Sequence, residues 1–207
     1  MSVNGTASRG RIRDAERTRR RILDAVAQRL RDAPTEPVSL DQVAKLARVA
    51  RSTIYLIFGS RAGLFDAFTE DLADRTGLAR LTEAVANPDT RQHLREGIAA
   101  GYRMFVQDLV VYRVLFSMNH IDPASLGGAV ERMEQRRAGG MAYLARRLAE
   151  DSVLRDDITV KQAEDLLWVL CSFETFDSLY TARGRSLDET IEAIVWTAEH
   201  ALCRPPA

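Results

Sequence analysis

Apolar residues recur along this chain at intervals of three and four, and no stretch alternates apolar with polar residues over the length of a strand. Intervals of three and four place apolar side chains on one face of an α-helix, whereas alternation is typical of a half-buried strand. Prolines, which end helices, fall between the periodic segments at Pro34, Pro37, Pro88 and Pro123. The sequence therefore predicts an all-α protein of about nine helices.

Composition narrows the class of protein. The 207 residues can form one large domain or two small ones, and 46% of them are hydrophobic, as in ordinary soluble globular proteins. Two cysteines, Cys171 and Cys203, are too few for a disulfide scaffold or a four-cysteine zinc site. No apolar run approaches the roughly 20 residues of a membrane helix, and the Arg-rich N-terminus lacks the apolar core of a secretory signal. We expect a cytoplasmic protein that uses no membrane, metal or cofactor, and leave a redox role for either cysteine open.

The net charge of zero hides an uneven distribution of charge. Residues 1–65 carry 13 Lys and Arg against 6 Asp and Glu, whereas residues 66–207 carry 16 against 23. Every basic residue except Lys45 and Lys161 is Arg, which suits bidentate contact with phosphate or a guanine edge, although a GC-rich coding sequence also favours Arg. The clustering of positive charge in the first third predicts a polyanion as its partner.

The segment between residues 38 and 61 carries the most specific pattern of the chain. It reads VSLDQVAKLARVARSTIYLIFGSR, in which we expect a helix ending at Ala47, a tight turn at residues 48–50 and a second helix at residues 51–57. Two short helices joined by a tight turn form a helix-turn-helix. Ser39 and Gln42 have the spacing of a capping box for the first of these helices.

Longer helices surround this pair. We expect a preceding helix at about residues 14–31, whose apolar stripe is Ile22, Leu23, Val26, Ala27 and Leu30. The later helices are expected at about residues 61–85, 89–108, 110–120, 124–150, 160–183 and 187–203. The predicted organisation is thus a flexible basic arm at residues 1–12, a three-helix helix-turn-helix domain at 13–60, and a larger helical domain at 61–207 for effector binding and dimerisation.

The helix-turn-helix segment resembles the N-terminal domain of TetR-family transcriptional regulators. The shared features are the basic first helix, Leu-x-x-Val-Ala-x-x-Ala at residues 40–47, Val49 in the turn, Arg-Ser-Thr-Ile-Tyr-x-x-Phe at residues 51–58, and Gly-Ser-Arg at residues 59–61 before Leu64 and Phe65. The resemblance covers about residues 15–65, and beyond it only length and helical character agree. It implies a sequence-specific DNA-binding regulator of the repressor type, and not an enzyme.

Five positions depart from the pattern of the family. Arg48 stands where the turn often has Gly, and Ala50 stands where Ser or Thr often caps the recognition helix, a loss that costs about 1 kcal/mol. Ile57 replaces a frequent aromatic residue or His, Arg61 replaces the usual Lys, and Gly63 stands where an acidic residue often completes a cap.

The resemblance also implies which residues contact DNA. The expected contacts are Gln42, Lys45, Arg51, Ser52, Thr53, Tyr55 and Arg61, with Arg9, Arg11 and Arg13 in an arm that enters the minor groove. Arg51 and Thr53 are expected to reach bases or else phosphates, and Ser52 with Tyr55 and Arg61 to position phosphates. Two alternatives stay open: Gln42 only caps its helix, and the basic arm is only a solvated face.

The back half of the chain holds ten of the fourteen aromatic residues, together with several Met residues. Helices lined with aromatic and Met side chains can enclose an apolar pocket with a few polar groups, although such residues can equally form plain core. The resemblance implies an effector pocket here. The candidate residues are Tyr102, Phe105, Arg113, Phe116, Asn119, His120, Met133, Trp168, Cys171 and Glu174.

A dimer interface is expected at residues 160–203. The six apolar residues from Leu166 to Cys171 predict a helix buried on all sides, with one face against a partner chain, and the family dimerises through its last two long helices. The candidate interface residues are Leu166, Leu170, Phe173, Ile191, Val195 and Leu202. A two-fold dimer places its recognition helices in successive major grooves, which predicts a near-palindromic operator.

The expected function is therefore a homodimeric repressor that a small, largely apolar effector releases from its operator. The first alternative is a dimeric DNA-binding regulator without an effector. The second is an all-α enzyme, against which the chain shows no phosphate-binding loop, nucleophile elbow or His-Glu-x-x-His motif, so no catalytic residue is proposed.

Overall fold

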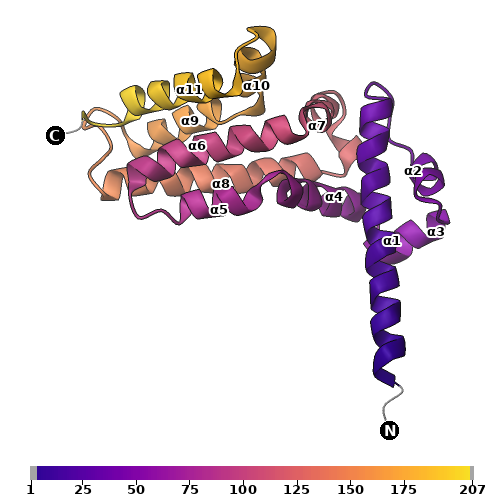
Figure 1. Ribbon diagram of the computed structural model, residues 1–207. Coiled ribbons are helices and arrows are strands. Elements are labelled where there is room, and N and C mark those ends of the chain that lie inside the picture. Colours follow the sequence, from indigo (N-terminus) through magenta and orange to yellow (C-terminus); the bar gives the residue numbers. More distant parts are fainter. Residues whose placement is uncertain (1–3, 206–207) are drawn as a thin grey trace. The chain divides into compact units, whose positions relative to one another are not determined.

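The computed structural model describes residues 4–205 of the chain, with side chains from residue 13 onward. Within this part the regular structure consists of eleven α-helices, one 3-10 turn and one π-helical turn, and it contains no strand (Figure 1). The all-α prediction is confirmed. The helices outnumber the expected nine because two expected helices are each broken in two.

The described chain divides into two compact units. One consists of Met1–Asp71 with Arg113–Val130, and the other of Leu72–Tyr112 with Glu131–Ala207. The expected boundary at residue 60 differs from this division, because residues that follow it associate with the helix-turn-helix. Arg61 donates from Nη1 to the backbone oxygen of Val38 at 2.8 Å and from Nη2 to that of Ser125 at 2.8 Å, and all three residues belong to the first unit.

The first helix, α1 (Asn4–Asp32), is longer than expected. The predicted stripe is confirmed, since Ile22 and Val26 have no exposed surface; burial of such a side chain contributes roughly 1.5–3 kcal/mol. The helix reaches back to Asn4, into the segment expected as a flexible arm. No proline interrupts residues 4–13, so the helix can extend from its packed part toward the N-terminus.

The helix-turn-helix consists of α2 (Leu40–Ala47) and α3 (Arg51–Phe58), which lie beside α1 (Figure 1). Four residues of α2 are buried: Leu40, Val43, Ala44 and Ala47. Arg48 has a left-handed backbone with φ 53° and ψ 49°, and Val49 N donates to Ala44 O at 3.0 Å. This is the hydrogen-bonding pattern of a Schellman motif, in which Gly is usual because it has no Cβ.

The predicted capping box at the start of α2 is wrong. Ser39 makes no side-chain hydrogen bond to the helix, and Gln42 Oε1 instead accepts from Arg29 Nε at 2.9 Å. Arg29 is only 5% exposed, so its guanidinium needs acceptors. A second acceptor is the carboxylate of Glu36 at 2.7 Å. The two contacts connect α1 to the loop between α1 and α2 and to α2 itself.

The segment expected as one helix at residues 61–85 is broken. The helix α4 (Arg61–Thr76) ends before Gly77, which has φ 127°, and α5 (Leu78–Val85) follows. Such a φ is open to Gly but strained for other residues. At the start of α4, Gly63 N donates to Ser60 Oγ at 2.9 Å, so Ser60 caps this helix.

The middle helices follow the predicted pattern closely. They are α6 (Thr90–Gln107) and α7 (Leu109–Ile121), followed by a 3-10 turn at Pro123–Leu126 and by α8 (Ala129–Glu150). The start of α8 lies five residues later than expected, after Gly127 and Gly128, whose φ values are 60° and 78°. Gly139 and Gly140 do not break α8.

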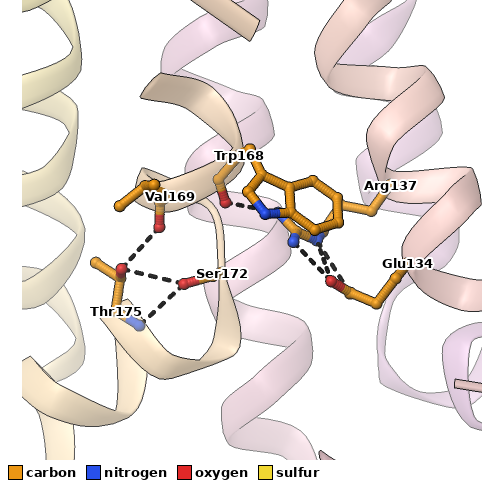
Figure 2. A network of polar contacts seen from close by, with 6 residues as sticks. All are labelled: Glu134, Arg137, Trp168, Val169, Ser172 and Thr175. Atoms are coloured by element: carbon orange, nitrogen blue, oxygen red, sulfur yellow. Dashed lines mark hydrogen bonds and ion pairs between the residues drawn. The ribbon is translucent and has the colours of Figure 1, made fainter. Parts of the chain in front are cut away.

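The helix expected at residues 160–183 is also broken. It comprises α9 (Val160–Leu170), α10 (Phe173–Asp177) and a π-helical turn at Ser178–Ala182. Ser172 caps α10 by accepting from Thr175 N at 3.1 Å. Figure 2 shows how the last carbonyls of α9 find side-chain donors: Thr175 Oγ1 donates to Val169 O at 2.7 Å, and Arg137 Nη1 donates to Trp168 O at 2.8 Å.

The last helix, α11 (Leu187–Leu202), packs against α6 and α9 in the second unit, and α5 packs against α6 (Figure 1). The buried residues of α11 are Thr190, Ile194, Ala198 and Leu202, spaced by four residues along one face. Among the described residues, no helix combines the length and the apolar character that crossing a membrane requires.

Candidate nucleic-acid interface

The helix α3 has one buried and one exposed side. Ile54 has no exposed surface, and the neighbouring Phe58 is half-buried, with the Arg19 guanidinium 4.9 Å from the centre of its ring. The opposite side carries four exposed residues, Arg51, Ser52, Tyr55 and Leu56. Residues four apart lie on the same face of a helix, so these side chains form one continuous exposed face. We call it the α3 face.

The α3 face contains three of the predicted DNA contacts, Arg51, Ser52 and Tyr55. Thr53, predicted to reach bases, is half-buried beside this face. At the start of α3, Ala50 has an extended backbone and provides no side-chain cap. The amide groups of the first turn are therefore left without the acceptor that a Ser or Thr would supply.

Arg51 is held by two neighbours. Its Nη1 donates to the carboxylate of Asp41 at 3.2 Å and 3.1 Å, and its Nη2 donates to the Tyr55 hydroxyl at 3.3 Å. The guanidinium carbon lies 5.8 Å from the centre of the Tyr55 ring. The hydrogen bond with Tyr55 and then the charge of Asp41 raise the pKa of Arg51, so the side chain stays cationic.

The other predicted contacts in this unit differ in availability. Lys45 is exposed on α2, whereas Gln42 accepts from Arg29. The guanidinium of Arg61 is half-buried and bound to backbone oxygens of Val38 and Ser125. Burial lowers the pKa of Arg61, against the effects of Tyr55 and Asp122. The structure thus gives Arg61 a bracing role, and its contact with phosphate stays a prediction.

The basic cluster of α1 is largely occupied by contacts within the first unit. Arg20 pairs with Asp71 at 2.5 Å, and Arg21 donates to the backbone oxygens of Ala47 and Arg48. Arg13 is exposed. The side chains of Arg9 and Arg11 lie outside the described residues.

In the second unit, two predicted effector residues belong to a cluster of packed aromatic rings. Tyr102 is 1% exposed, its hydroxyl donates to Leu170 O at 2.5 Å, and its ring centre lies 5.1 Å from that of Phe176. The ring centres of Phe105 and Phe173 lie 5.3 Å apart, in an edge-to-face arrangement. Burial and then Cys171 raise the pKa of Tyr102, which keeps the phenol protonated. The rings fill this region as a core does.

The remaining candidates in this unit have different surroundings. The guanidinium of Arg137 stacks on Trp168, with its central carbon 3.6 Å from the centre of the indole ring, and Arg137 also forms an ion pair with Glu134 at 2.7 Å (Figure 2). Met133 is half-buried. Burial raises the pKa of the Cys171 thiol to about 12, so it is protonated near neutral pH.

Glu174 does not lie among the aromatic rings. Its side chain is exposed, while Phe173 and Phe176 are buried on the other side of α10. Glu174 lines an open groove at the surface, together with Ser178, Leu179, Arg185 and Ile194. Glu174 lies in α10, after the break, and does not continue a face of α9.

Four effector candidates belong to the first unit. Arg113 is half-buried, Phe116 is buried, and His120 is exposed with its Nδ1 3.3 Å from Phe116 O. Asn119 has a buried Oδ1 without a hydrogen-bond partner in the described part of the chain.

The dimer candidates separate into core and surface. Leu202 is 0% exposed and Phe173 5%, so both are core residues of their own chain, and a contact of either with a partner stays a prediction. Leu166 is exposed, and Leu170, Ile191 and Val195 are half-buried. Of the run from Leu166 to Cys171, only Leu167 is fully buried, because α9 meets its own unit along one side only.

A comparison with protein families identifies the first part of the chain. The model of the family described as bacterial regulatory proteins, tetR family, matches residues 22–68, which span the packed part of α1 and the helix-turn-helix. Residues 22–68 are thus similar to the N-terminal, DNA-binding part of tetR-family regulators. The family match covers the buried stripe of α1 and the whole α3 face.

Individual proteins show the same similarity. The HTH-type transcriptional regulator AlkX of Mycobacterium tuberculosis is 39% identical over 69 residues, which are 33% of this chain and 30% of that protein. The chain thus aligns with less than a third of the length of this curated relative. The crystal structure of NalD, the secondary repressor of the MexAB-OprM multidrug efflux pump in Pseudomonas aeruginosa, matches with a TM-score of 0.71 at 22% identity, over 94% of this chain and all of that chain.

A TetR family transcription regulator from Marinobacter aquaeolei matches with a TM-score of 0.69 at 18% identity, over 93% of this chain and 98% of that chain. At such identities the two structural matches show the fold alone, over 93–94% of this chain. They extend the agreement beyond the residues that the family model covers.

Several residues with a notable position in the structure were not singled out from the sequence. Asp41 faces Arg51, Leu56 is 86% exposed in the α3 face, and Val169 and Trp196 are 57% and 61% exposed on α9 and α11. The position of Leu56, four residues after Ser52, indicated its face. Nothing local distinguishes Asp41 from other surface acids, and its contact depends on the turn that brings α2 and α3 together.

Proposed function

We propose that the chain is a homodimeric repressor that binds a specific, near-palindromic DNA operator in the cytoplasm. The observation that carries this proposal is the α3 face. A guanidinium binds guanine edges, hydroxyl groups bind phosphate oxygens, and an exposed Leu suits the methyl group of thymine. Arg51, Ser52, Tyr55 and Leu56 present these groups side by side. The similarity to AlkX, a transcriptional regulator, and to NalD, a repressor, supports it.

The start of α3 adds to this surface. Ala50 leaves the first-turn amides without a side-chain acceptor, and helix N-termini favour phosphate because their N–H groups point outward and the helix dipole is positive there. Exposed Lys45 on α2 contributes a second positive charge. In this proposal phosphate contacts orient the helix-turn-helix, and the α3 face selects the bases.

The second unit would supply the dimer interface through α9 and α11. Val169 and Trp196 are large apolar residues with more than half of their surface exposed in the single chain, and Leu166, Leu170, Ile191 and Val195 accompany them on these helices. Contiguous exposed apolar residues mark interaction surfaces. A two-fold dimer sets the half-sites about 34 Å apart, one turn of DNA.

The effector is proposed to be a small, largely apolar molecule bound beside Tyr102 and Phe105. It would shift the population of dimers toward a spacing that does not fit the operator, and its effect is limited by its differential affinity for the two states. The packing of these rings against Phe173 and Phe176 favours a second candidate, a regulator without an effector. Release of operator DNA by fatty acids or aromatic hydrocarbons in a binding assay would favour the first candidate, and no release by either class the second.

The experiment that tests DNA recognition is selection of bound fragments from a random-sequence DNA pool by the purified chain, at about 0.15 M salt, where non-specific contacts are weakened. We expect recovered fragments to share an inverted repeat. Arg51→Ala should weaken binding to it by at least about tenfold, because a bidentate base contact is worth about 1–3 kcal/mol and occurs once in each half-site.

The matched control is Arg80→Ala, which removes an exposed Arg from α5 in the second unit. It should bind the repeat as the unaltered chain does. Recovery of fragments without a shared sequence would refute sequence-specific recognition. Equal affinities of Arg51→Ala and Arg80→Ala would refute the assignment of the α3 face.

A further inference from the structure

An ion pair joins the two helices of the helix-turn-helix at their exposed surface. Asp41 is the second residue of α2, and Arg51 is the first residue of α3. Both side chains are well exposed, at 68% and 52%. One guanidinium nitrogen of Arg51 faces both carboxylate oxygens of Asp41 at 3.1–3.2 Å, while the other terminal nitrogen donates to the Tyr55 hydroxyl at 3.3 Å.

Stability does not explain this arrangement. An ion pair between exposed side chains contributes little to folding, since water already solvates both groups and salt screens them. What two simultaneous contacts do is restrict rotation: Asp41 holds one end of the guanidinium plane, and Tyr55 holds the other from a position one helical turn further along α3. The long Arg side chain is thereby ordered before anything binds to it.

The contacts also leave donors available. A guanidinium carries five N–H groups, and the hydrogen bonds to Asp41 and Tyr55 occupy at most three of them. Two parallel N–H donors match the O6 and N7 acceptors of guanine in the major groove. The carboxylate itself repels phosphate, so Arg51 is less suited to an unspecific contact with the DNA backbone while Asp41 faces it.

We propose that Asp41 is a positioning residue that, with Tyr55, fixes the Arg51 guanidinium for a guanine edge and so determines the base preference at one position of each half-site. This inference rests on the proposed function, because it requires that the α3 face reads DNA. It assigns a role in specificity to a residue outside the recognition helix and of the same charge sign as DNA.

The test measures the affinity of full-length variants for a set of operators. These operators carry each of the four bases in turn at the symmetric pair of positions where Arg51→Ala lacks the base preference of the unaltered chain. The unaltered chain should prefer guanine there by about tenfold or more. Asp41→Ala should reduce that preference to less than about threefold, leave the preferences at other positions unchanged and bind random-sequence DNA more tightly, because a negative charge is lost. Asp41→Asn, which retains an oxygen acceptor, should restore part of the preference.

The matched control is Glu70→Ala, which removes one exposed negative charge from α4 in the same unit. It should keep the guanine preference. Retention of the full preference by Asp41→Ala, or an equal loss at every position, would overturn the inference. Failure of the unaltered chain to select any sequence would instead refute the proposed function, so the two failures are distinguishable. A thermal melt of each variant identifies a loss of folding, and Asp41→Asn then carries the test because it retains the shape of the side chain.

Discussion

Arg61 is the residue for which a bracing role and a DNA-contact role make opposite predictions. Its guanidinium donates three hydrogen bonds, two to Ser125 O at 3.0 Å and 2.8 Å and one to Val38 O at 2.8 Å. Val38 is 2% exposed, so its carbonyl has little access to water once the donor is removed. Arg61→Ala therefore leaves two acceptors without their charged donor.

The expected loss follows from these two acceptors. A hydrogen bond to a charged group is worth about 1.5–3 kcal/mol, and we take the lower value because Arg61 is half-exposed. The free energy of unfolding should then fall by about 3 kcal/mol in Arg61→Ala. For a chain of this length this corresponds to a decrease in Tm of about 6–12 °C. Urea unfolding followed by circular dichroism measures the free energy directly.

Two further variants complete the Arg61 experiment. Arg80→Ala removes an exposed Arg and should unfold like the unaltered chain. Arg61→Lys keeps the charge, but a single ammonium group cannot reproduce the planar set of donors. We therefore expect its free energy of unfolding to fall by about half as much as that of Arg61→Ala. The bracing role is refuted if Arg61→Ala keeps the stability of the unaltered chain while it loses affinity for DNA, and if Lys restores that affinity.

Three other predictions follow from single features of the structure. Ala50→Ser should stabilise the chain by about 1 kcal/mol in urea unfolding, because the hydroxyl would accept from a first-turn amide of α3; a lower midpoint would contradict the capping geometry. Burial and then Arg147 lower the pKa of His93 below 6.5. As the pH falls, the unfolded chain therefore binds the proton before the folded chain does. The free energy of unfolding should be greatest above pH 6.5 and decrease below it. In urea unfolding, the free energy of His93→Gln should depend less on pH in that range, and an equal dependence would exclude His93 as the cause. Val169→Glu should convert the proposed dimer to a monomer in sedimentation, while Val85→Glu on α5 should not, and a dimer in both variants would refute an interface at Val169.

Much of the fold could be predicted because its signals are local. The stripe of α1 and the two helices of the helix-turn-helix each depend on residues within one or two helical turns, and the structure confirms them. The α3 face was predicted in part for the same reason, since a helix with Ile54 inside presents Arg51, Ser52 and Tyr55 outside.

Local patterns failed where residues far apart in the sequence decide the outcome. The break after α9 was missed because the donors to its last carbonyls include Arg137 and Tyr102, which are distant in the chain. The capping box at Ser39 was wrong because the buried Arg29 competes for Gln42.

The sequence by itself determined the helical class, the helix-turn-helix and its resemblance to tetR-family regulators, since apolar periodicity and a motif of about fifty residues are properties of neighbouring positions. Only the tertiary structure decided that Phe173 and Leu202 are core, that Arg61 braces two backbone carbonyls and that Asp41 faces Arg51. Each of these depends on which segments pack together. Burial and the satisfaction of hydrogen-bonding groups are properties of that packing, and no single stretch of sequence contains them.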